Sequence, residues 1–152
     1  MLRILFVCHG NICRSPMAEF VLRRKAAEAG IADRLEIASA ATSSEELGNP
    51  VYPPARRILQ AHGISCAGKT ARRITPEDYR RYDLLIGMDR ANIINMRRCF
   101  SGDPEGKLRL LLDPDEVSDP WYTDDFEQTW QDVNEGCDRL LAELLPRLKG
   151  AR

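Results

Sequence analysis

A cysteine and an arginine near the start of the chain have the spacing needed to transfer a phosphoryl group. Five residues separate Cys8 from Arg14 in the segment Cys8-His9-Gly10-Asn11-Ile12-Cys13-Arg14-Ser15. A cysteine thiolate is a strong nucleophile, and a guanidinium is a planar fork that can hold two phosphate oxygens together. We therefore expect Cys8 to attack phosphorus while Arg14 holds the phosphate group.

The residues between these two can form an anion-binding loop. Gly10 permits a positive φ, and Asn11 tolerates one better than most residues do. A loop that leads into a helix points several backbone N–H groups at one place, where the helix dipole adds positive potential. In that field we expect Cys8 to be a thiolate near neutral pH. We expect the Ser15 hydroxyl to donate a hydrogen bond to the sulfur. The residues expected to contact the substrate are His9, Gly10, Asn11, Ile12, Cys13 and Ser15.

Each of these residues also has a purely structural interpretation. A cysteine at the end of a strand is often a small buried hydrophobic residue, and an arginine in a first helical turn is often solvated. Ser15 can be only a helix N-cap. The spacing of all of them together, directly after a predicted strand, favours the catalytic interpretation.

The elements that must position this loop form an alternating pattern. Largely apolar segments predict strands at residues 3–7, 35–40, 83–88 and 108–112. Helical segments separate them: one is expected to start with Ser15 as N-cap and Pro16 at the first helical position and to end at Gly30. Asp89 is expected to cap a later helix. An apolar stripe from Phe126 to Leu148 predicts a final helix of about six turns.

This alternation predicts an α/β fold with a four-stranded parallel sheet and helices on both faces. Ligands of such sheets bind beyond the carboxyl ends of the strands, which is where the loop at residues 8–15 lies. No shift in composition marks a domain boundary, so we expect a single domain over residues 1–152.

The composition excludes several classes of protein. The formal net charge of −1 argues against a nucleic-acid-binding protein that acts through bulk charge. No apolar run approaches the roughly 20 residues of a membrane span. Five scattered cysteines without a CxxC pair predict reduced thiols in a cytoplasmic protein, and we expect structural roles for Cys66, Cys99 and Cys137. No cluster has the spacing of metal ligands.

The segment FVCHGNICRSPMAE closely resembles the low-molecular-weight protein tyrosine phosphatases, which carry a C-x5-R-S loop near the N-terminus. The similarity continues through SAATS, GNP and GMDRAN to a late Asp-Pro-aromatic motif. The resemblance implies hydrolysis of phosphotyrosine in a protein substrate through a phosphocysteine intermediate, with no metal and no cofactor.

The late motif is Asp119-Pro120-Trp121-Tyr122. The resemblance implies that Asp119 is the general acid and base, which protonates the leaving phenol and then activates water. Without the resemblance, Asp-Pro is a common turn pair that also occurs at Asp103 and Asp113. Trp121 and Tyr122 are expected to form a wall for the phenyl ring, or alternatively to pack against the last helix.

Several positions bear on specificity and regulation. Relatives with a second loop cysteine can close a reversible disulfide, which Cys13 would form with Cys8; alternatively Cys13 only packs behind the loop. Relatives that act on phosphoarginine have Thr where this chain has Ile12, which favours phosphotyrosine. Glu45 stands where relatives often have an aromatic residue, and Lys69 or Thr70 stands where many have His.

Two other functions are weaker. A thiol-coupled arsenate reductase shares this fold and loop, but it relays a disulfide through cysteines close together in sequence, whereas Cys66 and Cys99 are far apart. A non-catalytic phosphate-binding module would be favoured if the nucleophile or the acid were missing, and both are present.

Overall fold

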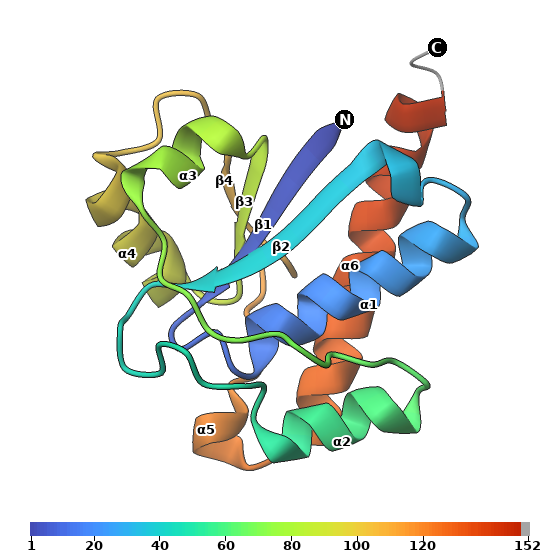
Figure 1. Cartoon of the computed structure of the whole chain (residues 1–152). Helices are drawn as coiled ribbons and strands as arrows, with labels where there is room; N and C mark the ends of the chain where they lie inside the picture. The colour runs from blue at the N-terminus through green and yellow to red at the C-terminus, as the bar shows by residue number, and fades with distance from the viewer. Residues whose placement is uncertain (150–152) are drawn as a thin grey trace.

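The computed structural model describes residues 1–149, which form an α/β fold around one parallel sheet (Figure 1). Its strand order is β2-β1-β3-β4. The strands are β1 (Leu2–Cys8), β2 (Leu35–Ala41), β3 (Leu84–Gly87) and β4 (Leu108–Leu110). The expected fold class is confirmed. Residues 150–152, which the expected domain includes, lie outside the described residues.

Helices cover both faces of the sheet, as expected. One face carries α1 (Arg14–Glu28) and α6 (Phe126–Lys149), which pack against each other, and α2 (Pro53–Ala61) packs on α6. The other face carries α3 (Pro76–Arg81) and α4 (Arg90–Phe100), while the short α5 (Pro120–Thr123) lies near the carboxyl ends of the strands. A 3-10 turn, η1 (Ala32–Arg34), joins α1 to β2.

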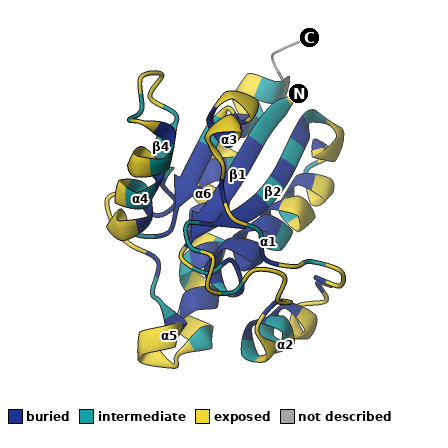
Figure 2. Ribbon diagram, turned by 60° about the vertical axis from the view of Figure 1, so that its left-hand side comes forward, coloured by how far each residue is buried: buried dark blue, intermediate teal, exposed yellow. Residues whose placement is uncertain are grey.

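Strand β1 is apolar from Ile4 to Cys8, and these residues are buried between the helices on the two faces of the sheet (Figure 2). Ile4 and Phe6 belong to the core cluster beneath α1 and α6. Leu5 and Val7 belong to the cluster beneath α3 and α4. Each such side chain contributes about 1.5–3 kcal/mol when fully buried, so the strand that leads to the loop is firmly anchored.

Helix α6 buries the predicted apolar stripe, including Val133, Cys137 and Leu144. Gly136 lies on the same stripe, where an added Cβ would be 2.5 Å from Cγ of Leu111. The glycine therefore lets the helix approach the segment that follows β4.

Two sequence-based boundaries are wrong. Ser15 is not the N-cap of α1, because the helix begins at Arg14 after Cys13, which places Pro16 in the third helical position. The Ser15 hydroxyl instead contacts Cys8. Strand β4 ends at Leu110 rather than at Leu112, because the chain turns there and Asp115 N donates to Leu112 O.

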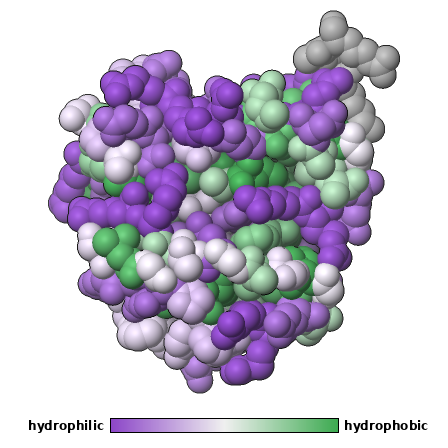
Figure 3. All heavy atoms as spheres, in the orientation of Figure 1, coloured by the Kyte–Doolittle hydropathy of each residue, from purple (hydrophilic) through white to green (hydrophobic). Residues whose placement is uncertain are grey.

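The face shown in Figure 3 is mostly hydrophilic, with small hydrophobic areas between polar side chains. None of the described helices combines the length and the hydropathy that crossing a bilayer requires.

Candidate active site

The loop between β1 and α1 lies where the strand order changes direction, with β2 on one side of β1 and β3 on the other. Asn11 adopts a φ of 59°, which turns the loop back over the end of β1. Several loop amides have no acceptor within the described part of the chain: those of Gly10, Ile12, Cys13, Arg14 and Ser15. Unpaired amides at the start of a helix form an anion-binding nest.

Cys8 lies at the base of this loop, and its side chain is directed toward the loop residues. The Asn11 amide donates to Sγ at 3.3 Å, and the Ser15 hydroxyl lies 3.0 Å from the same sulfur. Ser15 Oγ also accepts a hydrogen bond from Nδ2 of Asn11 at 2.8 Å. Because an amide nitrogen can only donate, the Ser15 proton is free to point at the sulfur. The sulfur is therefore within hydrogen-bonding distance of a backbone amide and of a hydroxyl that can donate to it.

Asn11 is held by contacts from three directions. Its Nδ2 donates to Ser15 at 2.8 Å and to Ser39 Oγ at 2.9 Å, and its Oδ1 accepts from the backbone N of Arg72 at 3.3 Å. These contacts offset the cost of the left-handed backbone conformation.

A buried polar network extends this support away from the loop. Ser39 donates to Oε1 of Glu19 at 2.6 Å, and Glu19 also pairs with Arg23 at 2.6 Å. Lys69 Nζ donates to Ser39 O at 2.9 Å and lies 3.6 Å from Glu19. Burial lowers the pKa of Lys69, although the nearby Glu19 carboxylate opposes this effect.

Glu19 and Ser39 support the loop although no motif in the sequence points to them. Glu19 is 3 % exposed, and the buried residues nearest to it in α1, Met17, Ala18 and Val21, are apolar. An acidic residue one turn after Ser15, within a buried stretch, is the signal that could have revealed it. Of Lys69 and Thr70, the structure places Lys69 in this network.

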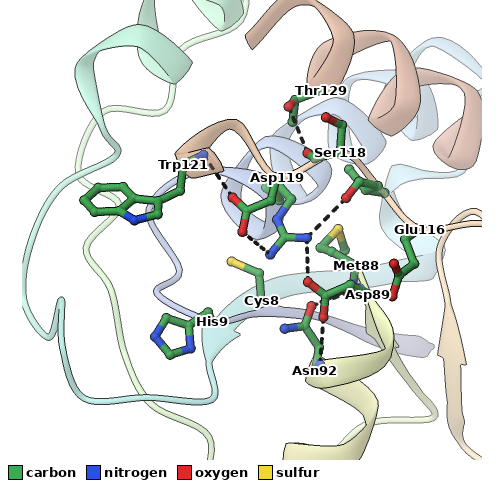
Figure 4. Close-up of polar contacts among 12 residues, drawn as sticks. Cys8, His9, Met88, Asp89, Asn92, Glu116, Ser118, Asp119, Trp121 and Thr129 are labelled. Carbon is green, nitrogen blue, oxygen red and sulfur yellow. Dashed lines mark hydrogen bonds and ion pairs between the residues drawn. The ribbon is translucent and has the colours of Figure 1, made fainter. Parts of the chain in front are cut away.

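Arg14 is buried beside the loop and is held by two carboxylates, Asp89 and Asp119, which Figure 4 labels. Its Nη1 donates to Asp89 at 2.9 Å and to Val117 O at 3.2 Å, and its Nη2 donates to Asp119 at 3.3 Å. Burial alone would lower the pKa of Arg14, but the neighbouring anions, Cys8 foremost, outweigh burial and raise that pKa. Asp89 also caps α4, as expected, by accepting from the Asn92 amide at 2.8 Å.

The structure distinguishes the three Asp-Pro aspartates. Asp119 meets Arg14 and caps α5 by accepting from Trp121 N at 3.1 Å. Asp103 instead supports the β4 region, because it accepts from the Tyr79 hydroxyl at 2.6 Å. Asp113 is exposed on the turn after β4. Of the three, the structure brings Asp119 to the loop.

The two aromatic residues after Asp119 lie on the surface. Trp121 is 69 % exposed and Tyr122 is 84 % exposed, so the alternative that they pack against the last helix is wrong. Trp121 extends from α5 beside Asp119 (Figure 4). It lines a hollow with Cys13, whereas Tyr122 is not among the lining residues.

Glu45 lies beside the loop at His9, and its carboxylate is 2.9 Å from Nε2 of that histidine. Ser43 fixes this segment to the loop, because its backbone N and its hydroxyl both donate to His9 O, at 3.1 and 2.9 Å. The side chain that position 45 presents beside His9 is therefore an acidic one and not an aromatic one.

Cys13 is a free thiol whose pKa is raised to about 12, first by burial and then by the negative charge of Cys8.

Cys66 and Cys137 are buried in the core, and Cys99 packs against the α3–α4 side of it. Within residues 1–149, no group of His, Cys, Asp and Glu side chains is arranged to hold a metal ion.

Comparison with known proteins agrees with this geometry. The family model described as low molecular weight phosphotyrosine protein phosphatase matches residues 3–149. The chain is 38% identical over 150 residues to the low molecular weight protein-tyrosine-phosphatase YfkJ of Bacillus subtilis, covering 95% of this chain and 96% of YfkJ. It is 36% identical to the low molecular weight phosphotyrosine protein phosphatase of Rattus norvegicus, covering 91% and 92%.

Solved structures show the same similarity. The crystal structure of YfkJ matches with a TM-score of 0.93 at 37% identity, covering 97% of this chain and 96% of that one. The crystal structure of SP-PTP from Streptococcus pyogenes, a low molecular weight protein tyrosine phosphatase, matches with a TM-score of 0.88 at 40% identity, covering 95% and 94%. The chain therefore belongs to the low molecular weight phosphotyrosine protein phosphatase family.

Proposed function

We propose that this protein hydrolyses phosphotyrosine in protein substrates, and that Cys8 carries the phosphoryl group between two displacements. The observation that supports this most is the contact of one buried arginine, Arg14, with Asp119 beside the loop that surrounds Cys8. It supports a site at which a nucleophile, an oxyanion clamp and a carboxyl group act together. Relatives named as protein-tyrosine phosphatases support the choice of substrate.

In the first displacement the Cys8 thiolate forms a bond to phosphorus as the bond to the phenolic oxygen breaks. Asp119 in its protonated form gives its proton to that oxygen, so the phenol leaves neutral. Arg14 and the loop amides bind the equatorial oxygens, which carry the charge of a loose transition state. The products of this step are a phenol and phosphocysteine.

In the second displacement water attacks phosphorus, and the bond to sulfur breaks. Asp119, now ionised, takes a proton from the water. The Ser15 hydroxyl donates to the departing sulfur, which makes the thiolate a better leaving group. Inorganic phosphate is released, and both Cys8 and Asp119 return to their starting protonation states.

The substrate class is tested by assaying phosphotyrosine, phosphoserine and phosphoarginine peptides of one sequence with the wild type and with Cys8→Ser. We expect turnover of the phosphotyrosine peptide by the wild type and none by Cys8→Ser, which should still bind phosphate. Preference for phosphoarginine would contradict the role of Ile12, and turnover by Cys8→Ser would contradict the nucleophile.

A further inference from the structure

A hollow of about 160 Å³ opens beside the phosphate-binding loop, between α5 and the segment that starts α2. Figure 1 shows these two elements next to each other at the lower end of the molecule. Three aromatic residues, a proline, a cysteine and a carboxylate line it: Tyr52, Trp121, Phe126, Pro120, Cys13 and Asp124. It is small beside the roughly 300–1,000 Å³ of pockets that take drug-sized ligands, so it suits a single side chain.

The lining has the chemistry of a cation site. Tyr52 and Phe126 are stacked with their ring centroids 6.1 Å apart, and Trp121 presents a third ring. The faces of aromatic rings attract Lys and Arg side chains, most strongly at Trp. Asp124 adds a carboxylate that has no ion-pair partner among residues 1–149. An anionic group is disfavoured here by the same carboxylate.

The hollow adjoins the candidate active site. Cys13 belongs both to the phosphate-binding loop and to the wall of the hollow, and Trp121 follows the proposed acid Asp119 by two residues. Cys13 stays a neutral thiol, since its pKa is raised to about 12 by burial. A residue that flanks phosphotyrosine in the substrate can therefore enter the hollow while the phosphate occupies the loop.

We propose that this hollow binds the side chain of a lysine or arginine that flanks the phosphotyrosine, and that Asp124 selects for that positive charge. This inference rests on the proposed function, because the phosphotyrosine places the flanking residue. It adds a preference for basic sequences around the phosphorylated tyrosine.

The test measures kcat/KM for matched phosphotyrosine peptides that carry lysine, acetyl-lysine or leucine at each flanking position in turn. Dividing the lysine value by the acetyl-lysine value for each enzyme cancels any change in the shared chemical step. For the wild type we expect a ratio of roughly 3 to 10 at one position. Asp124→Asn should bring that ratio close to one, and Asn is a suitable replacement because it tolerates the positive φ of 57° at this residue.

Asp125→Asn is the matched control, since it removes the same charge from the next residue, which does not line the hollow. Asn can also keep the contact in which Asp125 accepts from the Gln128 amide at 3.0 Å. The control should retain the wild-type ratio. A second variant, Tyr52→Leu, should lower the ratio by removing one ring, which tests the aromatic part of the site separately.

Three results would overturn the inference. They are a wild-type ratio near one at every position, an equal fall in Asp124→Asn and Asp125→Asn, or faster turnover of the leucine peptide than of the lysine peptide. Failure of the proposed function is distinguishable from these, because the wild type would then hydrolyse none of the peptides.

Discussion

Arg14 and Asp119, which are 105 positions apart in the chain, meet through a contact of 3.3 Å between Nη2 and Oδ2. The contact joins the first turn of α1 to the N-cap of α5. It fixes the proposed acid beside the group that is proposed to hold the phosphate, so the alignment of the two depends on α5 staying docked.

Asp119→Asn should lower kcat for an aryl phosphate by about 10² to 10⁴. The amide can still accept from the Trp121 backbone, so the cap of α5 is kept, but it cannot supply a proton. The loss should be smaller for a substrate whose phenol is a good leaving group. Steady-state kinetics on phenyl and nitrophenyl phosphates measure this difference, with Asp113→Asn as the charge-matched control on an exposed Asp-Pro pair. A larger effect of the control would show that the wrong aspartate has been chosen.

Asp89 is expected to position Arg14 in addition to capping α4. Asp89→Asn keeps a good N-cap but loses the ion pair of 2.9 Å, so the Kd for phosphate should rise roughly 10-fold, the effect of one charged hydrogen bond. Asp89→Ala loses the cap as well and should be about 1 kcal/mol less stable than Asp89→Asn. Phosphate titration and denaturant unfolding measure the two effects separately. Unchanged phosphate binding in both variants would exclude the positioning role.

Cys13 should protect Cys8 from irreversible oxidation. Peroxide converts the Cys8 thiolate to a sulfenic acid, and the Cys13 thiol then forms a disulfide with it and releases water. Oxidation removes the Cys8 charge, which is one cause of the raised pKa of Cys13, so the second thiol becomes easier to ionise. A dithiol should restore activity after mild peroxide in the wild type but not in Cys13→Ala. Equal recovery of both would remove this role.

Cys137 should make stability depend on alkaline pH. Burial in the core raises its pKa from 9.0 to about 12. Between those values the folded state keeps a proton that the unfolded state has lost, so the stabilisation is complete below pH 9 and declines as the pH rises toward 12. The free energy of unfolding should therefore fall by up to about 1.4 kcal/mol per pH unit from this residue.

Denaturant unfolding of Cys137→Ala at a series of alkaline pH values tests this. The cavity left by the substitution lowers stability at every pH, so the readout is the slope of the free energy of unfolding against pH. Val133→Ala, also fully buried on α6, makes a cavity without removing a titratable group and should keep the wild-type slope. An unchanged slope in Cys137→Ala would contradict the assignment.

The sequence was most informative where one local signal dominates. The apolar run from Ile4 to Cys8 in β1 reflects burial on both faces, and one short loop between β1 and α1 sets the spacing from Cys8 to Arg14. Serine is a good N-cap, so the sequence predicts that role for Ser15, but the helix begins at Arg14. The other expectation for Ser15 agrees with the structure, where its hydroxyl lies 3.0 Å from the sulfur of Cys8.

Tertiary packing determined the rest of the site. In the sequence only the aromatic pair that follows it and the family resemblance favour Asp119 over Asp103, and the folded chain then brings one to Arg14 and the other to Tyr79. The network through Glu19 likewise joins α1, β2 and the segment before α3, and so it depends on contacts that no short motif contains.

The phosphorylated residue itself can be identified directly. Asp119→Asn should accumulate the intermediate with a good leaving group, because the water that attacks phosphocysteine then lacks its base. Rapid acid quenching followed by mass spectrometry of the peptides should find one added phosphoryl group on the peptide that contains Cys8, and none on that peptide when Cys8 is replaced by Ser. A phosphoryl group on any other residue, or sustained turnover without the Cys8 thiol, would contradict the account.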